Sequence, residues 1–180
     1  MEVRLARIED AKEILEIYSP YILNTNITFE YEIPSLEEFQ QRMHKIMERY
    51  PYYVAVEDNK IIGYAYASTY KERKAYDWCC ELSIYVNDQL HHRGVGKELY
   101  HALLMTLKQM NYQLVYACIS YPNDKSVAFH QTFGFKKIAY FEKCGYKFNQ
   151  WHDMIWMEKR IGDSEKVCPI KTINDIDPIL

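Results

Sequence analysis

Residues 81–99 read ELSIYVNDQLHHRGVGKEL, and this stretch decides the fold that the sequence predicts. Apolar side chains stand at every second position from Leu82 to Val86, which is the period of a strand that buries one face. From Val95 onward the apolar positions recur at helical spacing, with charged residues on the opposite side. The stretch therefore predicts a strand, a turn with glycines and an amphipathic helix in succession.

Gly94 and Gly96 fall where the strand gives way to the helix. Glycine lets the backbone turn tightly and approach a ligand, and the first N–H groups of a helix have no partner within it. With Arg93 beside it, such a helix start is an anion site, most often for phosphate. A P-loop is excluded because His91 and Glu98 stand where it needs glycine and Ser or Thr, and a dinucleotide fingerprint needs three glycines. A turn that holds no ligand remains compatible with the two glycines alone.

The composition is that of one globular domain. A chain of 180 residues can bury a full core. Its 22 Lys and Arg against 25 Asp and Glu give a net charge of −3, which makes no electrostatic case for nucleic acid or a membrane as partner. No apolar run approaches the ~18 residues of a membrane span and the first residues form no signal peptide, so a cytoplasmic protein is expected.

The cysteines and histidines predict neither a disulfide framework nor a metal site. The five cysteines are odd in number and include no Cys-x-x-Cys pair. The spacing of His91, His92, His152 and Asp153 fits no common metal site. The 17 tyrosines are more than a core requires, so some are expected to line a pocket or an interface.

The order of elements predicts an α/β (α+β) fold with a single mixed, twisted sheet flanked by helices. The patterns run strand, helix, helix, three strands, helix, strand, helix and two closing strands. The helix from Val95 joins two strands as a crossover, which requires parallel pairing nearby. We expect one domain over residues 1–160. Residues 161–180 are polar, contain Pro169 and Pro178, and are expected to form a loosely packed tail.

The loop at Gly94 resembles the pyrophosphate loop of the GNAT N-acetyltransferases. The pattern of that family is Gln or Arg, two residues, Gly, one residue, and Gly or Ala; here His91 stands at the first position, which departs from it. Further blocks resemble one branch of the family, the phosphinothricin and methionine sulfoximine or sulfone N-acetyltransferases. They are residues 75–78 (AYDW), 122–127 (PNDKSV) with His130 and Gly134, and 145–147 (GYK) with 151–153 (WHD). The resemblance runs from about Val3 to Lys159.

This resemblance implies the GNAT fold and transfer of acetyl from acetyl-CoA, without a metal, to the α-amine of a small amino acid analogue such as phosphinothricin or methionine sulfoximine or sulfone. Only a neutral amine attacks a thioester, so a base must take its proton. The resemblance places Glu81 at the family's proposed base and His130 where an acid would protonate the leaving thiolate. The residues alone are also compatible with an exposed strand-end carboxylate at Glu81 and a structural histidine at His130.

The resemblance also implies where acetyl-CoA is held. The backbone edge of Ile84, Tyr85 and Val86 would pair with the pantetheine amides, and the N–H of Tyr85 or Val86 would stabilise the oxyanion. Asn123 would hydrogen-bond the pantetheine arm, unless it only caps a turn or helix. The loop expected to hold the pyrophosphate consists of His92, Arg93, Gly94, Val95, Gly96 and Lys97.

The charged loop before the central strand is the candidate substrate site. A guanidinium at Arg73 could hold the substrate's acidic group in fork geometry, whereas a solvated loop is the alternative. The aromatic residues Phe29, Tyr31, Tyr76 and Trp78 could enclose a short side chain. Lys74 and Ala75 of the loop are also candidate substrate residues. A homodimer is expected from the resemblance and from the aromatics near residue 151.

Two other functions were weighed against amino acid acetylation. A GNAT enzyme acting on protein N-termini or lysines would need an open acidic groove, which the bulky aromatic residues do not favour. A non-catalytic acyl-CoA-binding module would tolerate loss of the base, and the presence of Glu81 counts against it.

Overall fold

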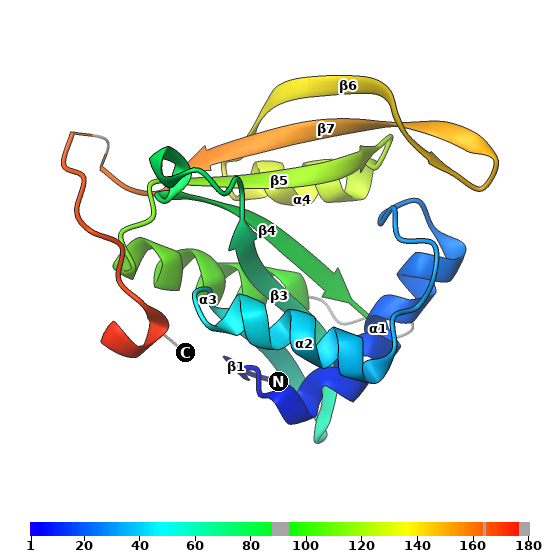
Figure 1. Ribbon diagram of the computed structural model, residues 1–180, viewed down its shortest axis with the longest axis horizontal. Helices are drawn as coiled ribbons and strands as arrows, with labels where there is room; N and C mark the ends of the chain where they lie inside the picture. The colour runs from blue at the N-terminus through cyan, green and yellow to red at the C-terminus, as the bar shows by residue number, and fades with distance from the viewer. Residues whose placement is uncertain (88–93, 164, 177–180) are drawn as a thin grey trace.

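The computed structural model describes residues 1–87, 94–163 and 165–176 as one seven-stranded sheet with helices on both faces (Figure 1). The strands lie side by side in the order β1-β2-β3-β4-β5-β7-β6. This is the mixed sheet that the sequence predicted. The strands are β1 (Glu2–Leu5), β2 (Tyr52–Glu57), β3 (Lys60–Thr69), β4 (Cys79–Val86), β5 (Leu114–Tyr121), β6 (Lys136–Lys147) and β7 (Gln150–Arg160). The helices are α1 (Ala11–Asn24), α2 (Leu36–Met47), α3 (Val95–Gln109) and α4 (Asp124–Thr132), with short 3-10 turns η1 (Ile8–Asp10), η2 (Lys74–Tyr76) and η3 (Ile173–Asp175).

The central feature of the sheet is the parallel pair formed by β4 and β5. Helix α3 connects them as a crossover, so the predicted parallel pairing is confirmed. The ladder joins only three residue pairs, from Cys79 with Leu114 to Glu81 with Tyr116. Beyond Glu81 the two strands diverge, as Figure 1 shows. The facing backbone edges of the remaining strand ends are therefore not paired with each other.

Each face of the sheet is covered by its own helices. On one face α1 and α2 pack on an apolar cluster that includes Ile14, Phe39 and Tyr64. On the other face α3 packs on a second cluster that includes Leu82 and Leu103. Because strand residues alternate between the faces, Glu81, Ser83 and Tyr85 point to the α1–α2 side of the sheet and Leu82 and Ile84 to the α3 side.

Local signals in the sequence account for the helix ends. The N-cap Ser35 accepts a hydrogen bond from the N–H of Glu38 at 3.1 Å, as its sequence predicts. Gly134 follows α4 with φ at +81°, the left-handed conformation that glycine adopts at helix ends. Pro20 lies inside α1 without ending it.

The described part of the tail contacts the core at several points. Ile161, Ile170 and Ile173 pack against the cluster under α3. The indole N–H of Trp78 donates to the carbonyl of Cys168 at 2.7 Å. None of the described helices is long and apolar enough to cross a membrane.

Candidate active site

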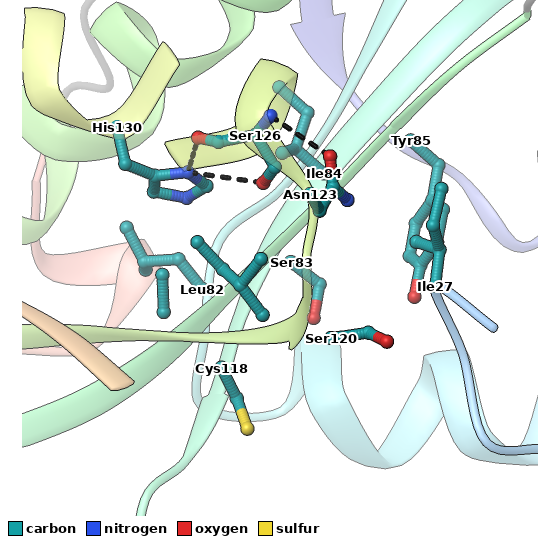
Figure 2. A pocket seen from close by; sticks show the side chains of 12 residues that line it. Ile27, Leu82, Ser83, Ile84, Tyr85, Cys118, Ser120, Asn123, Ser126 and His130 are labelled. Atoms are coloured by element: carbon teal, nitrogen blue, oxygen red, sulfur yellow. Dashed lines mark hydrogen bonds between the residues drawn. The ribbon is translucent and has the colours of Figure 1, made fainter. Parts of the chain in front are cut away.

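A small cavity of about 60 Å³ opens where β4 and β5 diverge (Figure 2). Its walls are residues 82–85 of β4, residues 117–120 of β5, Ile27 from the α1–α2 loop and the first turns of α4. Helix α4 contributes Ser126 and His130, and Asn123 precedes it. The volume suits an acetyl group and an amine rather than a whole substrate.

Glu81 immediately precedes the β4 residues that line this cavity, at the last residue pair of the β4–β5 ladder, and is not itself one of the lining residues. Its side chain shares a sheet face with Ser83, which lines the cavity. Burial raises the pKa of the Glu81 carboxyl above its ordinary value, and no second cause contributes. A raised pKa makes a carboxylate a better general base near neutral pH.

Cys118 lines the cavity on the β5 side, yet its sulfur is a poor nucleophile. Burial raises the pKa of its thiol to about 12, and the negative charge of Glu81 makes a smaller contribution to this rise. The reactive form of cysteine is the thiolate, which is scarce at neutral pH under these conditions. The site therefore favours direct attack by the amine over a covalent acyl-cysteine.

The backbone edge of β4 toward the cavity is set by its pairing with β3. The N–H of Asn87 donates to the carbonyl of Ile62 in β3 at 2.9 Å. Because an antiparallel ladder alternates, Tyr85 then directs its N–H toward β3 and Val86 directs its own toward the open side. The carbonyl of Val86 points to the same side of the strand as its N–H and accepts from the hydroxyl of Tyr21 at 2.6 Å, so it is not paired with β3. Of the two predicted oxyanion donors, this geometry favours Val86.

The start of α3 has the backbone of an anion site. Gly94 adopts φ +101°, and a Cβ built there would meet none of the described residues within 4 Å. A Cβ at Gly96 would come within 3.3 Å of Phe129 and 3.4 Å of Ile84, so glycine here lets the helix pack closely. The first amides of the helix, including those of Val95 and Lys97, have no partner in its own ladder. These features fit the pyrophosphate of acetyl-CoA.

Two of the predicted loop residues, His92 and Arg93, lie outside the described residues. Ile84 and Tyr85 line the cavity, as does Asn123. The side-chain oxygen of Asn123 accepts from the N–H of Ser126 at 3.1 Å, so the capping role left open by the sequence is present.

His130 is buried, with 3% of its surface exposed, and both ring nitrogens have protein partners; Figure 2 shows the partner of Nδ1, Ser126. Nδ1 lies 2.7 Å from the carbonyl of Ser126, which can only accept, so Nδ1 carries the proton. Nε2 then accepts from the hydroxyl of Tyr100 at 2.8 Å. Burial lowers the pKa of His130. A neutral, fully bonded imidazole supports the structural alternative for this residue.

The predicted substrate residues do not gather at the cavity. Arg73, Lys74 and Ala75 are exposed on η2 and its N-cap, and none of them lines it. Tyr76 packs edge-on against Tyr70, with ring centroids 5.6 Å apart. The ring of Phe29 lies against Gly145, where an added Cβ would come within 2.1 Å of it.

Sequence reasoning missed the small polar residues of the cavity. Ser120 is 5% exposed, and its hydroxyl has no hydrogen-bond partner among the described residues. A buried hydroxyl without a partner costs roughly 1–3 kcal/mol, so a bound ligand or water that bonds it is favoured. The alternation of Cys118 and Ser120 on one face of β5 was the signal that could have found them.

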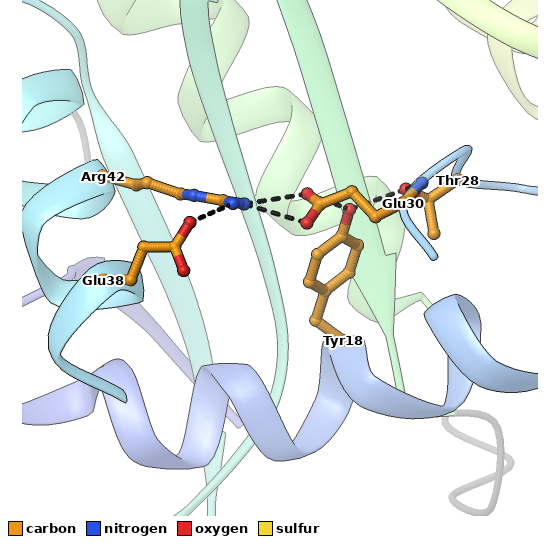
Figure 3. Close-up of polar contacts among 5 residues, drawn as sticks. All are labelled: Tyr18, Thr28, Glu30, Glu38 and Arg42. Carbon is orange, nitrogen blue, oxygen red and sulfur yellow. Dashed lines mark hydrogen bonds and ion pairs between the residues drawn. The ribbon is translucent and has the colours of Figure 1, made fainter. Parts of the chain in front are cut away.

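A polar network anchors the loop between α1 and α2 beside this face (Figure 3). Arg42 of α2 makes two hydrogen bonds of 3.0 Å to the carboxylate of Glu30 and a third of 2.6 Å to Glu38. The hydroxyl of Tyr18 bonds Thr28 at 2.7 Å and Glu30 at 3.0 Å. The loop is therefore tied to both helices.

Among the described residues, no cluster of three His, Cys, Asp or Glu side chains could hold a metal ion. His152 and Asp153, considered above as ligands, bond protein groups instead. Nδ1 of His152 lies 2.9 Å from the amide nitrogen of Asn26, and Asp153 accepts from the hydroxyl of Tyr140.

Comparison with known families gives the class of protein to which this fold belongs. Residues 3–156 match the model of the acetyltransferase (GNAT) domain. The chain belongs to the GNAT acetyltransferases, and it is an acetyl-CoA-dependent N-acetyltransferase.

Its relatives fall in the branch that the sequence resembled. The chain is 30% identical over 179 residues to the phosphinothricin N-acetyltransferase of Streptomyces viridochromogenes, which covers 99% of this chain and 96% of the relative. It is 24% identical to the L-methionine sulfoximine/L-methionine sulfone acetyltransferase of Salmonella typhimurium, over 91% of this chain and 96% of that one. The crystal structure of a GNAT superfamily phosphinothricin acetyltransferase from Sinorhizobium meliloti, in complex with AcCoA, superposes with a TM-score of 0.89 at 31% identity and covers 97% of this chain and 96% of its own.

Proposed function

We propose that the protein acetylates the α-amino group of a small amino acid analogue, such as phosphinothricin or methionine sulfoximine or sulfone. The observation that carries the proposal is the partly buried carboxylate of Glu81, whose pKa is raised by burial and which immediately precedes the β4 residues of a cavity of about 60 Å³. That cavity would receive the acetyl group and the attacking amine. The substrate class is supported by relatives that carry these substrates in their names.

In this mechanism each residue has one task. Acetyl-CoA supplies an activated acetyl group as its thioester. Glu81 takes the proton from the amine, directly or through one water, so that the nitrogen can attack. The N–H of Val86 points to the open side of β4, where it can donate to the acetyl oxygen as negative charge develops there. As the nitrogen–carbon bond forms and the carbon–sulfur bond breaks, the departing thiolate takes up a proton, for which His130 remains the proposed donor.

The histidine can supply that proton only if its hydrogen bonds change. Its Nδ1–H is held by the carbonyl of Ser126 and its Nε2 accepts from Tyr100. Because burial lowers the pKa of His130, the imidazolium is not its resting form. Burial also raises the pKa of the Tyr100 hydroxyl, which makes it a weaker acid than the thiol that forms, so the proton would reach the ring and then the thiolate from water that enters the cavity.

A substrate panel tests the function. Acetyl-CoA-dependent thiol release is measured with phosphinothricin, methionine sulfoximine, methionine sulfone, the free amino acids, and peptides that offer a free N-terminus or a lysine. We expect kcat/KM to be highest for the amino acid analogues. A preference for the peptides would overturn the proposal in favour of a protein acetyltransferase, and an absence of release with every amine would favour a binding module.

We also propose that the protein is a homodimer that pairs through the β6–β7 edge. Strand β6 ends the sheet, and most of its residues are exposed on both faces. Ile138 and Phe141 are 51% and 45% exposed, and Trp151 beyond the turn is 59% exposed. Large exposed apolar side chains along the edge of a sheet favour association with another chain.

A further inference from the structure

Lys147, at the end of β6, is a buried lysine that no step of acetyl transfer uses. It is 2% exposed, and its ammonium donates to three backbone carbonyls: Ile22 at 2.7 Å, Thr25 at 2.8 Å and Thr28 at 2.8 Å. An ammonium has three protons, so each one has an acceptor. Burial lowers the pKa of Lys147, and the charge of Glu30 partly offsets this effect.

The three carbonyls belong to one continuous piece of chain. Ile22 lies in the last turn of α1, whose final carbonyls have no helical partner, and a cation at that end also interacts favourably with the helix dipole. Thr25 and Thr28 lie in the loop that follows. The side chain of Lys147, on the edge strand β6, thus bonds both the last turn of α1 and the loop that follows it.

The same loop has further contacts with the β6–β7 turn. His152 bridges them, because its Nε2 bonds the carbonyl of Lys147 at 2.9 Å and its Nδ1 bonds Asn26 at 2.9 Å. The hydroxyl of Tyr31 donates to the carbonyl of Tyr146. The ring of Phe29 fills the space above Gly145, where no side chain would fit.

The loop that follows α1, which Lys147 and His152 bond, forms part of the wall of the candidate active site. Its Ile27 lines the cavity between β4 and β5. Asn26 and Ile27 also line a wider groove of about 480 Å³, whose other walls include Phe148 and His152 of the β6–β7 turn and Asn123. Cavity and groove share Ile27 and Asn123, so they adjoin, and the groove leads outward between the loop and the turn.

We propose that Lys147 and His152 are positioning residues for the amine acceptor. By fixing the loop from Thr25 to Thr28 against the β6–β7 turn, they hold Ile27 at the cavity and set the width of the groove that receives the acceptor's side chain. This inference rests on the proposed function in one respect, namely that the acceptor enters from the side of the sheet where Glu81 and the loop lie.

The test compares Lys147→Met with the wild type in two measurements. Methionine keeps the length of the side chain but cannot bond the three carbonyls. Hydrogen–deuterium exchange of residues 25–31, measured without substrate, should become at least about tenfold faster as the loop loses its anchor. The KM for the amine should rise by about tenfold or more, since misplaced contacts weaken positioning, while the Kd for acetyl-CoA should change less than about twofold.

Lys143→Met is the matched control, because this lysine lies on the same hairpin with a solvent-exposed side chain. It should leave both measurements unchanged. Asn26→Ala removes the hydrogen bond to His152 and keeps Lys147, and it should raise the KM for the amine to a smaller degree. If Lys147→Met does not fold, this variant provides the test. Unchanged exchange in the folded variants would overturn the proposal whatever the substrate is. Faster exchange with an unchanged KM would show that the loop is anchored but does not position the acceptor.

Discussion

Glu81 occupies a position where its ionisation opposes folding. Because burial raises the pKa of its carboxyl, the folded protein binds this proton more readily than the unfolded chain does. The resulting stabilisation is present below the ordinary carboxyl pKa and is lost as the pH rises through the raised value. At neutral pH an ionised Glu81 therefore lowers the free energy of unfolding. Active sites commonly retain groups that cost stability in this way.

Glu81→Gln should lower kcat at neutral pH by on the order of 10²-fold, the effect of losing a general base, and leave the affinity for acetyl-CoA nearly intact. The same change should raise the melting temperature at pH 8, and this gain should shrink as the pH falls toward about 4, where the wild-type carboxyl is protonated. Thermal unfolding across this pH range and steady-state kinetics check both effects. Wild-type kcat in the variant would remove Glu81 from the mechanism.

Arg73 is an exposed residue beside η2, and its proposed role rests on its chemistry. If its guanidinium binds the substrate's carboxylate by two parallel hydrogen bonds, Arg73→Lys keeps the positive charge but cannot make both bonds. Substrate binding should then weaken by roughly 1–3 kcal/mol. KM should then rise more than kcat falls, since the contact exists before and during reaction. The measurement is a cycle of both enzymes with methionine sulfone and its decarboxylated amine. An equal fall in kcat/KM for both substrates would assign Arg73 to a solvated loop.

Among the elements, α3 carries the clearest test of acetyl-CoA binding. Its N-cap, Gly94, is left-handed, and no atom of the described part of the chain lies within 4 Å of where a side chain would begin. A β-branched residue there would strain the backbone by about 1–2 kcal/mol and would project into the space beside the first amides of the helix. Gly134 has the same kind of backbone, with φ +81°, at the end of α4.

Acetyl-CoA should raise the melting temperature of the wild type, because a ligand at about 100 times its Kd stabilises the folded state by about 2.7 kcal/mol. Gly94→Val and Gly134→Val should both lower the melting temperature of the unliganded protein, since both force valine into a left-handed backbone. Only Gly94→Val should abolish the increase produced by acetyl-CoA. If Gly94→Val keeps the full increase, the loop before α3 does not hold the ligand.

At the scale of the whole molecule, the β6–β7 edge is an open apolar surface. A strand at the end of a sheet offers unpaired backbone groups, and large exposed apolar side chains beside them favour association. The wild type should sediment at micromolar concentration with twice the chain mass of 21.6 kDa. Ile138→Glu combined with Phe141→Glu should give the monomer mass, because charges at an apolar interface must be desolvated. A monomeric wild type would end the dimer proposal.

Local periodicity was enough to predict the order of the elements and the mixed sheet. The change of period at Val95 marked the strand, turn and helix around which the chain is built, and a crossover helix allows only parallel pairing of its two strands. Gly134 follows the end of α4 because the left-handed backbone there favours glycine. The family was predicted from short sequence blocks whose order along the chain is specific. The proposed roles of Glu81 and His130 follow from that resemblance.

Tertiary packing decided what those side chains face. The cavity exists because β4 and β5 part after Glu81, and no local pattern encodes where a parallel pair ends. The imidazole of His130 is neutral because it is buried, and Tyr100, 30 residues away along the chain, bonds it inside the core. Lys147 belongs to the GYK block of the family resemblance, which predicted no partner for it, and the carbonyls that bind it lie more than 100 residues earlier. Burial and hydrogen bonding between such distant segments arise only when the sheet brings them together, which is why the sequence alone determined the elements and the structure decided the site.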